Sequence, residues 1–331
     1  MPSLVGSEMC IRDRKYAVYK GRSGLTTISF YGSFHGRTAL TLTLTGQRKY
    51  KGRLGNFANY PGVIHVTPPY YYRFGGSMDE KDFGLWIADY VAEVIDYFEP
   101  ESVGAVIVEP ILGKGGIIVP PDTFLPRLRK ITEIRGIPLI IDEVQTGLGR
   151  TGKMFACEHW SIEPDIMTLA KALGGGLPLG AIITSEEISS SLEPGDHFST
   201  FGGNPICCAA ASAVLDIIRE EKLVENASSV GEYILNALRE LEVDYDFVGE
   251  VRGKGLMIGI EFVEDKDSKR PAQELAQKIK SEMLKKGYIL GLGGIYKNVL
   301  RIQPPLIIRR EEAEKFIETI YETLNKTRTQ P

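Results

Sequence analysis

The hydrophobic and polar positions of this chain alternate between short apolar runs and amphipathic stretches. Several apolar runs are bounded by glycine, proline or charged residues, as are strands buried on both faces of a parallel sheet. The runs that predict strands in the first two thirds of the chain are 26–31, 102–108, 137–141, 165–170 and 179–184. Between them, apolar residues recur at helical spacing over 82–98 and 124–135. This alternation predicts an α/β fold with a doubly wound, mostly parallel sheet flanked by helices.

The last third of the chain has a different pattern. Residues 206–242 form a long helical run, and we expect this run to lead from one lobe into another. Strand-like and helical segments then alternate, which predicts a smaller α+β lobe with its own core. The predicted strands are 256–263, 288–293 and 299–308, and the predicted helices are 271–286 and 310–326. We therefore expect a large domain over 15–215 and a small C-terminal domain over 216–331.

Three segments do not follow this pattern. The first fourteen residues, MPSLVGSEMCIRDR, resemble a translated linker, and we expect 1–14 to be a non-native leader. Residues 15–24 are typical of a helix tail with a glycine stop, which predicts a large domain that is incomplete at its N-terminus. Residues 46–76 are rich in Gly, Pro, Tyr and Arg, and we expect a long irregular loop there. Its aromatic cluster at 70–73 has two interpretations, substrate contact and packing.

Composition narrows the class of protein. The chain has 331 residues, a net charge of −4 and no basic run, so nothing in it favours nucleic acid or an anionic membrane as a partner. No apolar stretch reaches the length of a membrane-spanning helix, and we expect a cytoplasmic protein without a signal peptide. The four cysteines, Cys10, Cys157, Cys207 and Cys208, have no metal-binding or disulfide spacing. We predict that they are small buried residues and that the protein binds no metal.

Two charged residues stand at the ends of neighbouring predicted strands. The run 137–141 ends in Asp142, and the run 165–170 ends in Lys171. Because ligands of parallel α/β sheets bind at the carboxyl ends of the strands, both are candidate catalytic residues. Pyridoxal phosphate (PLP) requires this pair of residue types, a lysine amine for its aldehyde and an acid for its ring nitrogen. Each residue alone has a structural alternative, since aspartate often caps helices and lysine often lies in exposed loops.

A glycine-rich stretch after the first of these strands offers another interpretation. Gly147, Gly149 and Gly152 in GLGRTG have the spacing of a dinucleotide-binding fingerprint. Asp142 and Glu143 before the turn disfavour a phosphate, and the residues after it lack a clear helix start. A nicotinamide-dependent dehydrogenase is therefore the weaker interpretation.

Several blocks together resemble one enzyme family. The segment IDEVQTGLGRTGKMFACEHWSIEPDIMTLAKALGGGLPLGA is similar to the signature of class III (ω-amino acid) PLP-dependent aminotransferases, which include acetylornithine, ornithine and 4-aminobutyrate aminotransferases. The blocks SFHGRT, VEPILGKGG, STFGGNP and NVLRIQPPL follow in the family order, and the resemblance covers residues 15–325. It implies the fold of fold-type I PLP-dependent transferases and a PLP cofactor. It also implies transamination of an ω-amino donor with 2-oxoglutarate, by a homodimer with a shared active site.

The resemblance implies a role for each residue around the cofactor ring. Lys171 would form the Schiff base, or internal aldimine, and would move the proton during the reaction. Asp142 would pair with the ring nitrogen, and Gln145 would hydrogen-bond the 3′-oxygen of the ring.

Four further residues complete the cofactor site that the resemblance implies. Val144 and Phe34 would pack on opposite faces of the ring, with His35 next to Phe34. Thr200 would reach the phosphate of the cofactor in the partner subunit, which places the active site at a dimer interface.

Arginines define the substrate side that the resemblance implies. Arg37 would bind the carboxylate distal to the reacting amine, and Arg301 would bind the α-carboxylate, with Glu109 as a further substrate-side residue. The sequence departs from the family block EPIQGEGG, since Leu112 and Lys114 stand in it here. A lysine cannot neutralise Arg301 as the family's glutamate does, so we expect donor recognition to differ from that of the best-known members.

Two alternatives keep the same cofactor site. An amino-acid racemase or epimerase would use Lys171 and Asp142 without 2-oxoglutarate, and fold does not decide between the two reactions. The other alternative is an inactive truncated fragment, because the family's N-terminal part carries a Ser-Gly-Thr loop that binds the cofactor phosphate.

Overall fold

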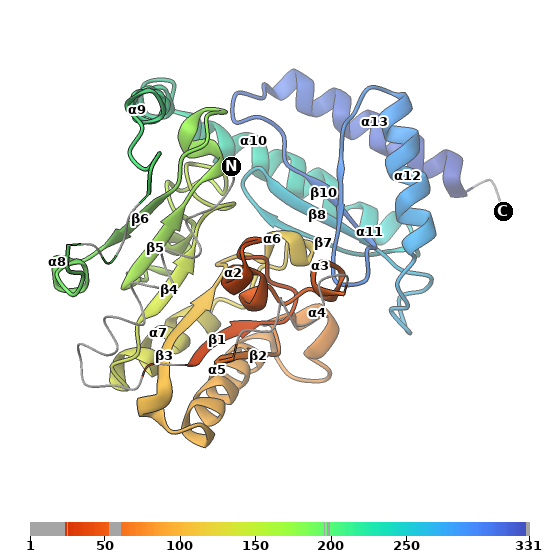
Figure 1. Cartoon of the computed structure of the whole chain (residues 1–331). Helices are drawn as coiled ribbons and strands as arrows, with labels where there is room; N and C mark the ends of the chain where they lie inside the picture. The colour runs from red at the N-terminus through yellow and green to blue at the C-terminus, as the bar shows by residue number, and fades with distance from the viewer. Residues whose placement is uncertain (1–23, 25, 53–60, 195, 197–198, 329–331) are drawn as a thin grey trace.

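Two sheets organise the molecule (Figure 1). The computed structural model describes residues 24, 26–52, 61–194, 196 and 199–328, so the predicted leader lies outside the described residues. The first sheet contains, in spatial order, β2 (Val63–Val66), β1 (Thr26–Phe30), β3 (Val103–Val108), β4 (Leu139–Asp142), β5 (Ile166–Leu169) and β6 (Ala181–Thr184). All neighbours pair in parallel except β6, which is antiparallel to β5. The predicted α/β fold with a mostly parallel sheet is confirmed.

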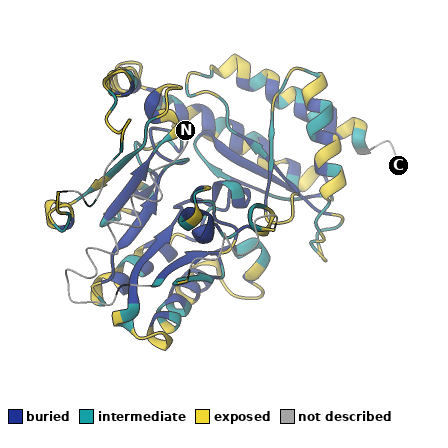
Figure 2. Ribbon diagram, viewed as in Figure 1, coloured by how far each residue is buried: buried dark blue, intermediate teal, exposed yellow. Residues whose placement is uncertain are grey.

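Burial explains why the central strands read as continuous apolar runs. Every residue of β3, β4 and β5 is buried, as expected for strands that are covered on both faces (Figure 2). Helices α5 (Glu80–Tyr97) and α7 (Phe124–Ile134) share one hydrophobic core with these strands. Asp79 caps α5, since its side chain accepts a hydrogen bond from the backbone N–H of Lys81 at 2.9 Å. Both predicted helices are confirmed.

The segment predicted as a long irregular loop contains regular structure. Its described part holds α3 (Arg48–Lys51), β2 and α4 (Tyr71–Phe74), so the prediction is wrong there. The strand β2 has only four residues, and its pairing with β1 defines it. The short helices α2 (Ala39–Leu44), α6 (Gly113–Gly116) and α8 (Glu186–Ser189) complete the first part of the chain.

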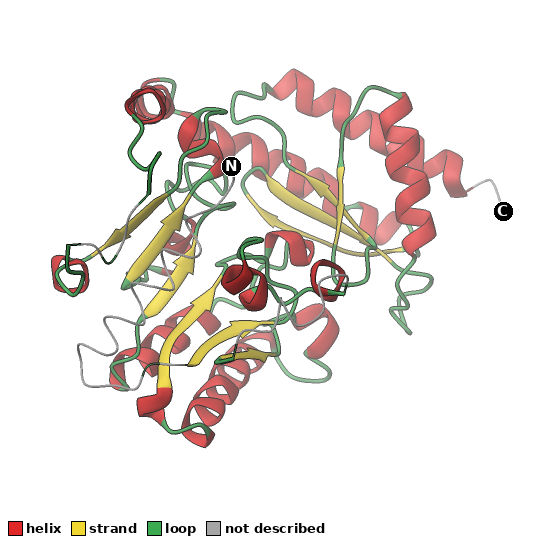
Figure 3. Ribbon diagram, in the orientation of Figure 1, coloured by secondary structure: helices red, strands yellow, loops and turns green. Residues whose placement is uncertain are grey.

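The second sheet is antiparallel and is formed by the last third of the chain (Figure 3). Its spatial order is β7 (Val248–Lys254), β8 (Met257–Phe262), β10 (Val299–Ile302) and β9 (Gly291–Gly293). Helices α10 (Leu223–Arg239), α12 (Gln273–Lys285) and α13 (Arg310–Arg328) build a separate hydrophobic core with it, and α11 (Leu241–Asp244) precedes β7. The strand β7 was not predicted, because only Val248 and Val251 are apolar in it.

The predicted helical run 206–242 is broken. α9 (Pro205–Glu220) ends before Lys222, whose backbone is left-handed at φ 52°, and α10 begins as a separate helix at Leu223. The domain boundary at 215/216 stays a prediction.

The burial of the cysteines can be compared with the described residues. Cys157 and Cys207 are buried, but Cys208 is exposed, so the prediction of burial is wrong for Cys208. Cys10 lies outside the described residues. Within the described part of the chain, no helix is long and apolar enough to cross a membrane. No group of three or more His, Cys, Asp or Glu side chains in that part could hold a metal ion.

Candidate active site

The candidate site lies where β4 and β5 end at the same edge of the parallel sheet. The strands pair with Asp142 opposite Thr168, and Lys171 follows two residues after the end of β5. Lys171 begins a 3₁₀ turn with a left-handed backbone at φ 48°. A residue with a Cβ is strained in this conformation, and such strain clusters at functional sites. Strand order and register therefore place the acid and the lysine at adjacent strand ends.

Asp142 is a buried carboxylate, with 6% of its surface exposed. His35 Nδ1 lies 2.7 Å from Asp142 Oδ2, and the backbone N–H of Val144 donates to Oδ1 at 3.1 Å. Burial raises the pKa of Asp142, but the hydrogen bond and attraction from His35, together with Lys171, outweigh it and hold the pKa below its ordinary value. A carboxylate that stays ionised while buried fits a protonated ring nitrogen.

Lys171 reaches back toward the end of β4. Its Nζ lies 3.5 Å from the carbonyl oxygen of Val144. Part of the residue is exposed, but the protein atoms around its amine desolvate it and so lower its pKa. The charge of Arg301 also lowers this pKa, while the charges of Asp142 and Glu109 raise it. A lowered pKa favours the unprotonated amine, which is the form that reacts with an aldehyde.

Three buried side-chain nitrogens near these residues have no hydrogen-bond partner among the described residues. They are His35 Nε2, Gln145 Nε2 and Arg301 Nε. Buried polar groups are nearly always paired in folded proteins, so these atoms indicate that a further polar group completes the site. The Gln145 amide packs on Gly113, where an added Cβ would lie 2.2 Å from Nε2. The unpartnered nitrogens, the ionised acid and the lysine amine together fit PLP.

Phe34 and Glu109 connect the loop after β1 to the loop after β3. Glu109 is 5% exposed, and its two carboxylate oxygens accept hydrogen bonds from the backbone N–H groups of Phe34 at 2.8 Å and Gly113 at 2.9 Å. The half-buried Phe34 ring meets Tyr50 edge-on, with 5.1 Å between the ring centroids. Glu109 therefore holds two loops together, and its substrate contact stays a prediction.

The protonation of Glu109 predicts a pH dependence of stability. Burial raises the pKa of Glu109 from 4.5 to about 7; His35 opposes this shift and Asp142 adds to it. The folded chain then binds this proton more tightly than the unfolded chain. The free energy of unfolding should therefore fall by about 3 kcal/mol from this group as pH rises from about 4.5 to 7, with no further change above. Urea unfolding of the parent and Glu109→Gln across this range checks the prediction, and parallel pH profiles would contradict it.

Arg301 lies on β10 and is half-buried. It fits beside β9 because Gly293 has no side chain; an added Cβ there would lie 2.8 Å from Arg301 Nε and 3.4 Å from the carbonyl oxygen of Lys114. The loop carrying Lys114 therefore lies directly beside Arg301. Burial lowers the pKa of the Lys114 amine, and the nearby charge of Arg301 lowers it further. The two cations share one region, as the departure from the family block indicated.

Arg37 is exposed, and its guanidinium lies 5.2 Å from the centre of the Tyr50 ring. Lys49 Nζ also lies over this ring, at 4.9 Å. Because the same ring contacts Phe34, the cations Arg37 and Lys49 stand next to the predicted cofactor site. Sequence reasoning missed Lys49 and Tyr50, for which the grouping of an aromatic residue with three cations at 48–51 was the available signal.

Two predicted cofactor residues are placed without a test of their role. Val144 is half-buried and lies between Asp142 and Gln145 at the end of β4, where its backbone contacts both Asp142 and Lys171. Thr200 is exposed in the turn before α9. Its contact with a partner subunit stays a prediction.

Comparison with known proteins connects this geometry to one family. The family model of class III aminotransferases matches residues 9–324. A 5-aminovalerate aminotransferase of Pseudomonas aeruginosa is 39% identical over 311 residues, which cover 92% of this chain and 70% of the relative. A leucine/methionine racemase of Thermococcus litoralis is 37% identical over 294 residues, covering 88% of this chain and 64% of the relative. The chain thus spans about two thirds of the length of these relatives.

A solved structure agrees over nearly the whole chain. The PLP-bound amine transaminase of an uncultivated Pseudomonas species superimposes with a TM-score of 0.92 at 32% identity, covering 97% of this chain and 74% of that one. The expected fold of fold-type I PLP-dependent transferases is therefore confirmed. The chain belongs to the class III aminotransferases, enzymes whose cofactor is pyridoxal 5′-phosphate.

Proposed function

We propose that this chain transfers an amino group from an ω-amino acid to 2-oxoglutarate. The observation that carries the proposal is the placement of Asp142 and Lys171 at adjacent strand ends, with Arg301 close enough to influence the pKa of Lys171. When bound, PLP supplies an aldehyde that accepts the amino group and a ring that withdraws electrons from the substrate carbon. The 5-aminovalerate aminotransferase among the relatives is named for an ω-amino donor, which supports this substrate class.

The residues at the strand ends handle the proton and the ring. Lys171 Nζ would hold the cofactor through its aldehyde and would move the proton at the amino-bearing carbon of the donor, for which its lowered pKa is suited. The Asp142 carboxylate would hold the proton of the ring nitrogen, and His35 orients that carboxylate. Val144 and Phe34 would hold the ring, and the unpartnered Gln145 amide would bind the ring oxygen.

The substrate carboxylates are bound on the side of Tyr50 and β10. Arg301 binds the α-carboxylate of 2-oxoglutarate, and Arg37 binds the distal carboxylate. Glu109 supports this side through the two loops that it connects. In a cytoplasmic homodimer, Thr200 of one subunit reaches the cofactor phosphate of the other. Residues 15–215 form the large domain of each subunit, and residues 216–331 form the small one.

Dependence on an acceptor tests the proposal. We expect the PLP-loaded chain to produce glutamate from 2-oxoglutarate in the presence of 5-aminovalerate or 4-aminobutyrate, and to produce none when either substrate is omitted. Glutamate formation from neither donor would contradict the proposed reaction.

The racemase among the relatives supports one other function. A racemase would interconvert the enantiomers of an amino acid in the absence of any 2-oxo acid. Chiral chromatography of alanine, leucine and methionine after incubation with the loaded chain separates the two functions, since a transaminase requires the acceptor.

Lys114 is expected to set substrate preference through its charge. It places a second cation beside Arg301, which favours substrates with two carboxylates over substrates with one. In Lys114→Glu, the new carboxylate should neutralise Arg301. The kcat/KM ratio for 4-aminobutyrate over glutamate should then rise about tenfold, which corresponds to about 1.4 kcal/mol.

Two variants control for the change in charge. Lys114→Gln removes the cation without adding an anion and should shift the ratio by a smaller factor. Lys153→Glu makes the same change in net charge at an exposed position and should leave the ratio unchanged. An unchanged ratio in Lys114→Glu would show that this lysine does not determine specificity.

A further inference from the structure

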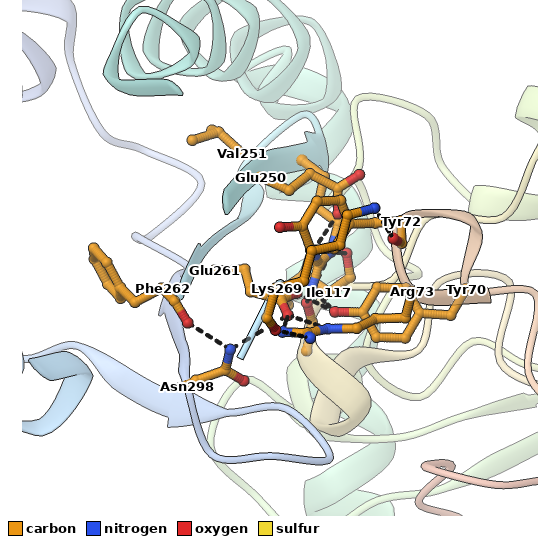
Figure 4. A network of polar contacts seen from close by, with 12 residues as sticks. Tyr70, Tyr72, Arg73, Ile117, Glu250, Val251, Glu261, Phe262, Lys269 and Asn298 are labelled. Atoms are coloured by element: carbon orange, nitrogen blue, oxygen red, sulfur yellow. Dashed lines mark hydrogen bonds and ion pairs between the residues drawn. The ribbon is translucent and has the colours of Figure 1, made fainter. Parts of the chain in front are cut away.

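A buried ionic cluster joins the segment after β2 to the second sheet (Figure 4). Its centre is Glu261 of β8, which is fully buried. Glu261 accepts hydrogen bonds from Arg73 Nε at 2.8 Å, from Arg252 Nη1 at 2.7 Å and from the Tyr70 hydroxyl. Arg73 also donates to the carbonyl oxygen of Lys269. Tyr70 and Arg73 thus pack the segment after β2 against the second sheet, which is the packing interpretation of their aromatic cluster.

Arg252 differs from the other members because it also binds the backbone of an active-site loop. Its Nε donates to the carbonyl oxygens of Gly116 at 3.2 Å and Ile117 at 3.1 Å, and its Nη2 donates to Gly116 at 2.7 Å and to the Tyr70 hydroxyl at 3.0 Å. Its Nη1 pairs with Glu261 and Glu250. Every nitrogen of this buried guanidinium has an acceptor, so the side chain is fixed in one orientation.

The loop that Arg252 binds is 112–118, which carries Lys114. Leu112 and Ile118 close its base with backbone hydrogen bonds of 3.0 and 3.2 Å. The N–H of Gly113 donates to Glu109, and the carbonyl oxygen of Lys114 accepts from the N–H of Gly294 at 3.2 Å. Ile117 is left-handed at φ 54°, a conformation that a residue with a branched Cβ keeps only when surrounding contacts enforce it.

Strand register places this loop between two arginines. Arg252 of β7 and Arg301 of β10 both pair with Gly259 of β8, so the three residues form one row across the sheet. The loop rests on the middle of this row, because an added Cβ at Gly259 would lie 3.1 Å from Ile117 Cβ and 3.2 Å from the carbonyl oxygen of Gly116. Arg252 therefore binds the loop on one side of Gly259, while Arg301 lies on the other side beside Lys114.

We propose that Arg252 is a positioning residue that clamps loop 112–118 onto the second sheet and so holds Lys114 beside Arg301 and Gly113 on Glu109. The clamp itself depends only on the hydrogen bonds of Arg252 to Gly116 and Ile117 and on the packing of these two residues on Gly259. Its effect on substrate binding rests on the proposed function of Lys114 and Arg301.

Hydrogen exchange tests the clamp independently of activity. In Arg252→Lys the cation beside Glu261 and Glu250 is kept, but the fork that binds two carbonyl oxygens is lost. We expect amide exchange in peptides covering 112–118 to become at least about tenfold faster. The matched control is Arg73→Met, which removes another ion pair of Glu261 but no contact to the loop. It should lower the melting temperature without changing exchange in this loop.

Gly259→Ala tests the same clamp without altering any charge. The added methyl group should push the turn at 116–117 away from the sheet and reproduce the faster exchange.

In PLP-loaded protein, Arg252→Lys and Gly259→Ala should both raise the KM for 2-oxoglutarate about tenfold while kcat changes less than threefold. Unchanged exchange in Arg252→Lys, or equal acceleration in Arg73→Met, would overturn the clamp. Faster exchange with an unchanged KM would instead overturn the substrate role of the loop and leave the clamp standing.

Discussion

Replacing Lys171 with alanine is expected to abolish the absorbance band near the visible edge that the parent chain develops with PLP. It should also lower the transamination rate by at least about 10⁴-fold, because the variant loses both the amine that binds the aldehyde and the group that moves the proton. The structural reason is position. Lys171 is the first residue of the turn after β5, and its Nζ reaches the end of β4 at the Val144 carbonyl oxygen.

Absorbance spectra and circular dichroism of the parent, Lys171→Ala and Lys130→Ala check this prediction. Lys130→Ala removes an exposed lysine on α7 and should keep both the band and the rate. A band of parental intensity in Lys171→Ala would mean that another amine binds the aldehyde. No band in any of the three would contradict PLP binding by this chain.

Replacing Asp142 with asparagine is expected to lower kcat on the order of 10²- to 10³-fold while the Lys171-dependent band persists. Asparagine has the same shape but cannot carry the charge that holds a proton on the ring nitrogen, and preorganised charges of this kind contribute a factor of that size. The carboxylate is well suited to the role because its pKa is lowered despite its burial. His35 would also lose a charged partner at 2.7 Å.

The control for Asp142→Asn is Asp165→Asn. Asp165 precedes β5, at the opposite end of the strand from Lys171, where it pairs with Arg129 and accepts a hydrogen bond from the backbone N–H of Leu139 at 2.8 Å. Its loss should lower the melting temperature but leave kcat within about twofold. A kcat for Asp142→Asn within threefold of the parent would show that the ring nitrogen needs no charged partner here.

Strong local patterns determined much of this fold in advance. The buried strands β3, β4 and β5 are continuous apolar runs, and a run of that kind has few alternatives to a strand covered on both faces. The positions of Asp142 and Lys171 at strand ends followed directly, because the residue after an apolar run lies at the edge of the sheet. Weak local patterns failed, as at β7 and β2, where pairing with a neighbour rather than composition makes the strand.

What only the tertiary structure decided is which distant residues meet. His35 and Asp142 are 107 residues apart, and their contact depends on β1 and β4 lying in one sheet. Arg252 and Arg301 share a row across Gly259, which follows from the register of three antiparallel strands. The sequence alone determined the strongly patterned strands and helices, the family and the two residues at the strand ends. The partners of those residues depend on strand order and register, which non-local packing sets and no local pattern encodes.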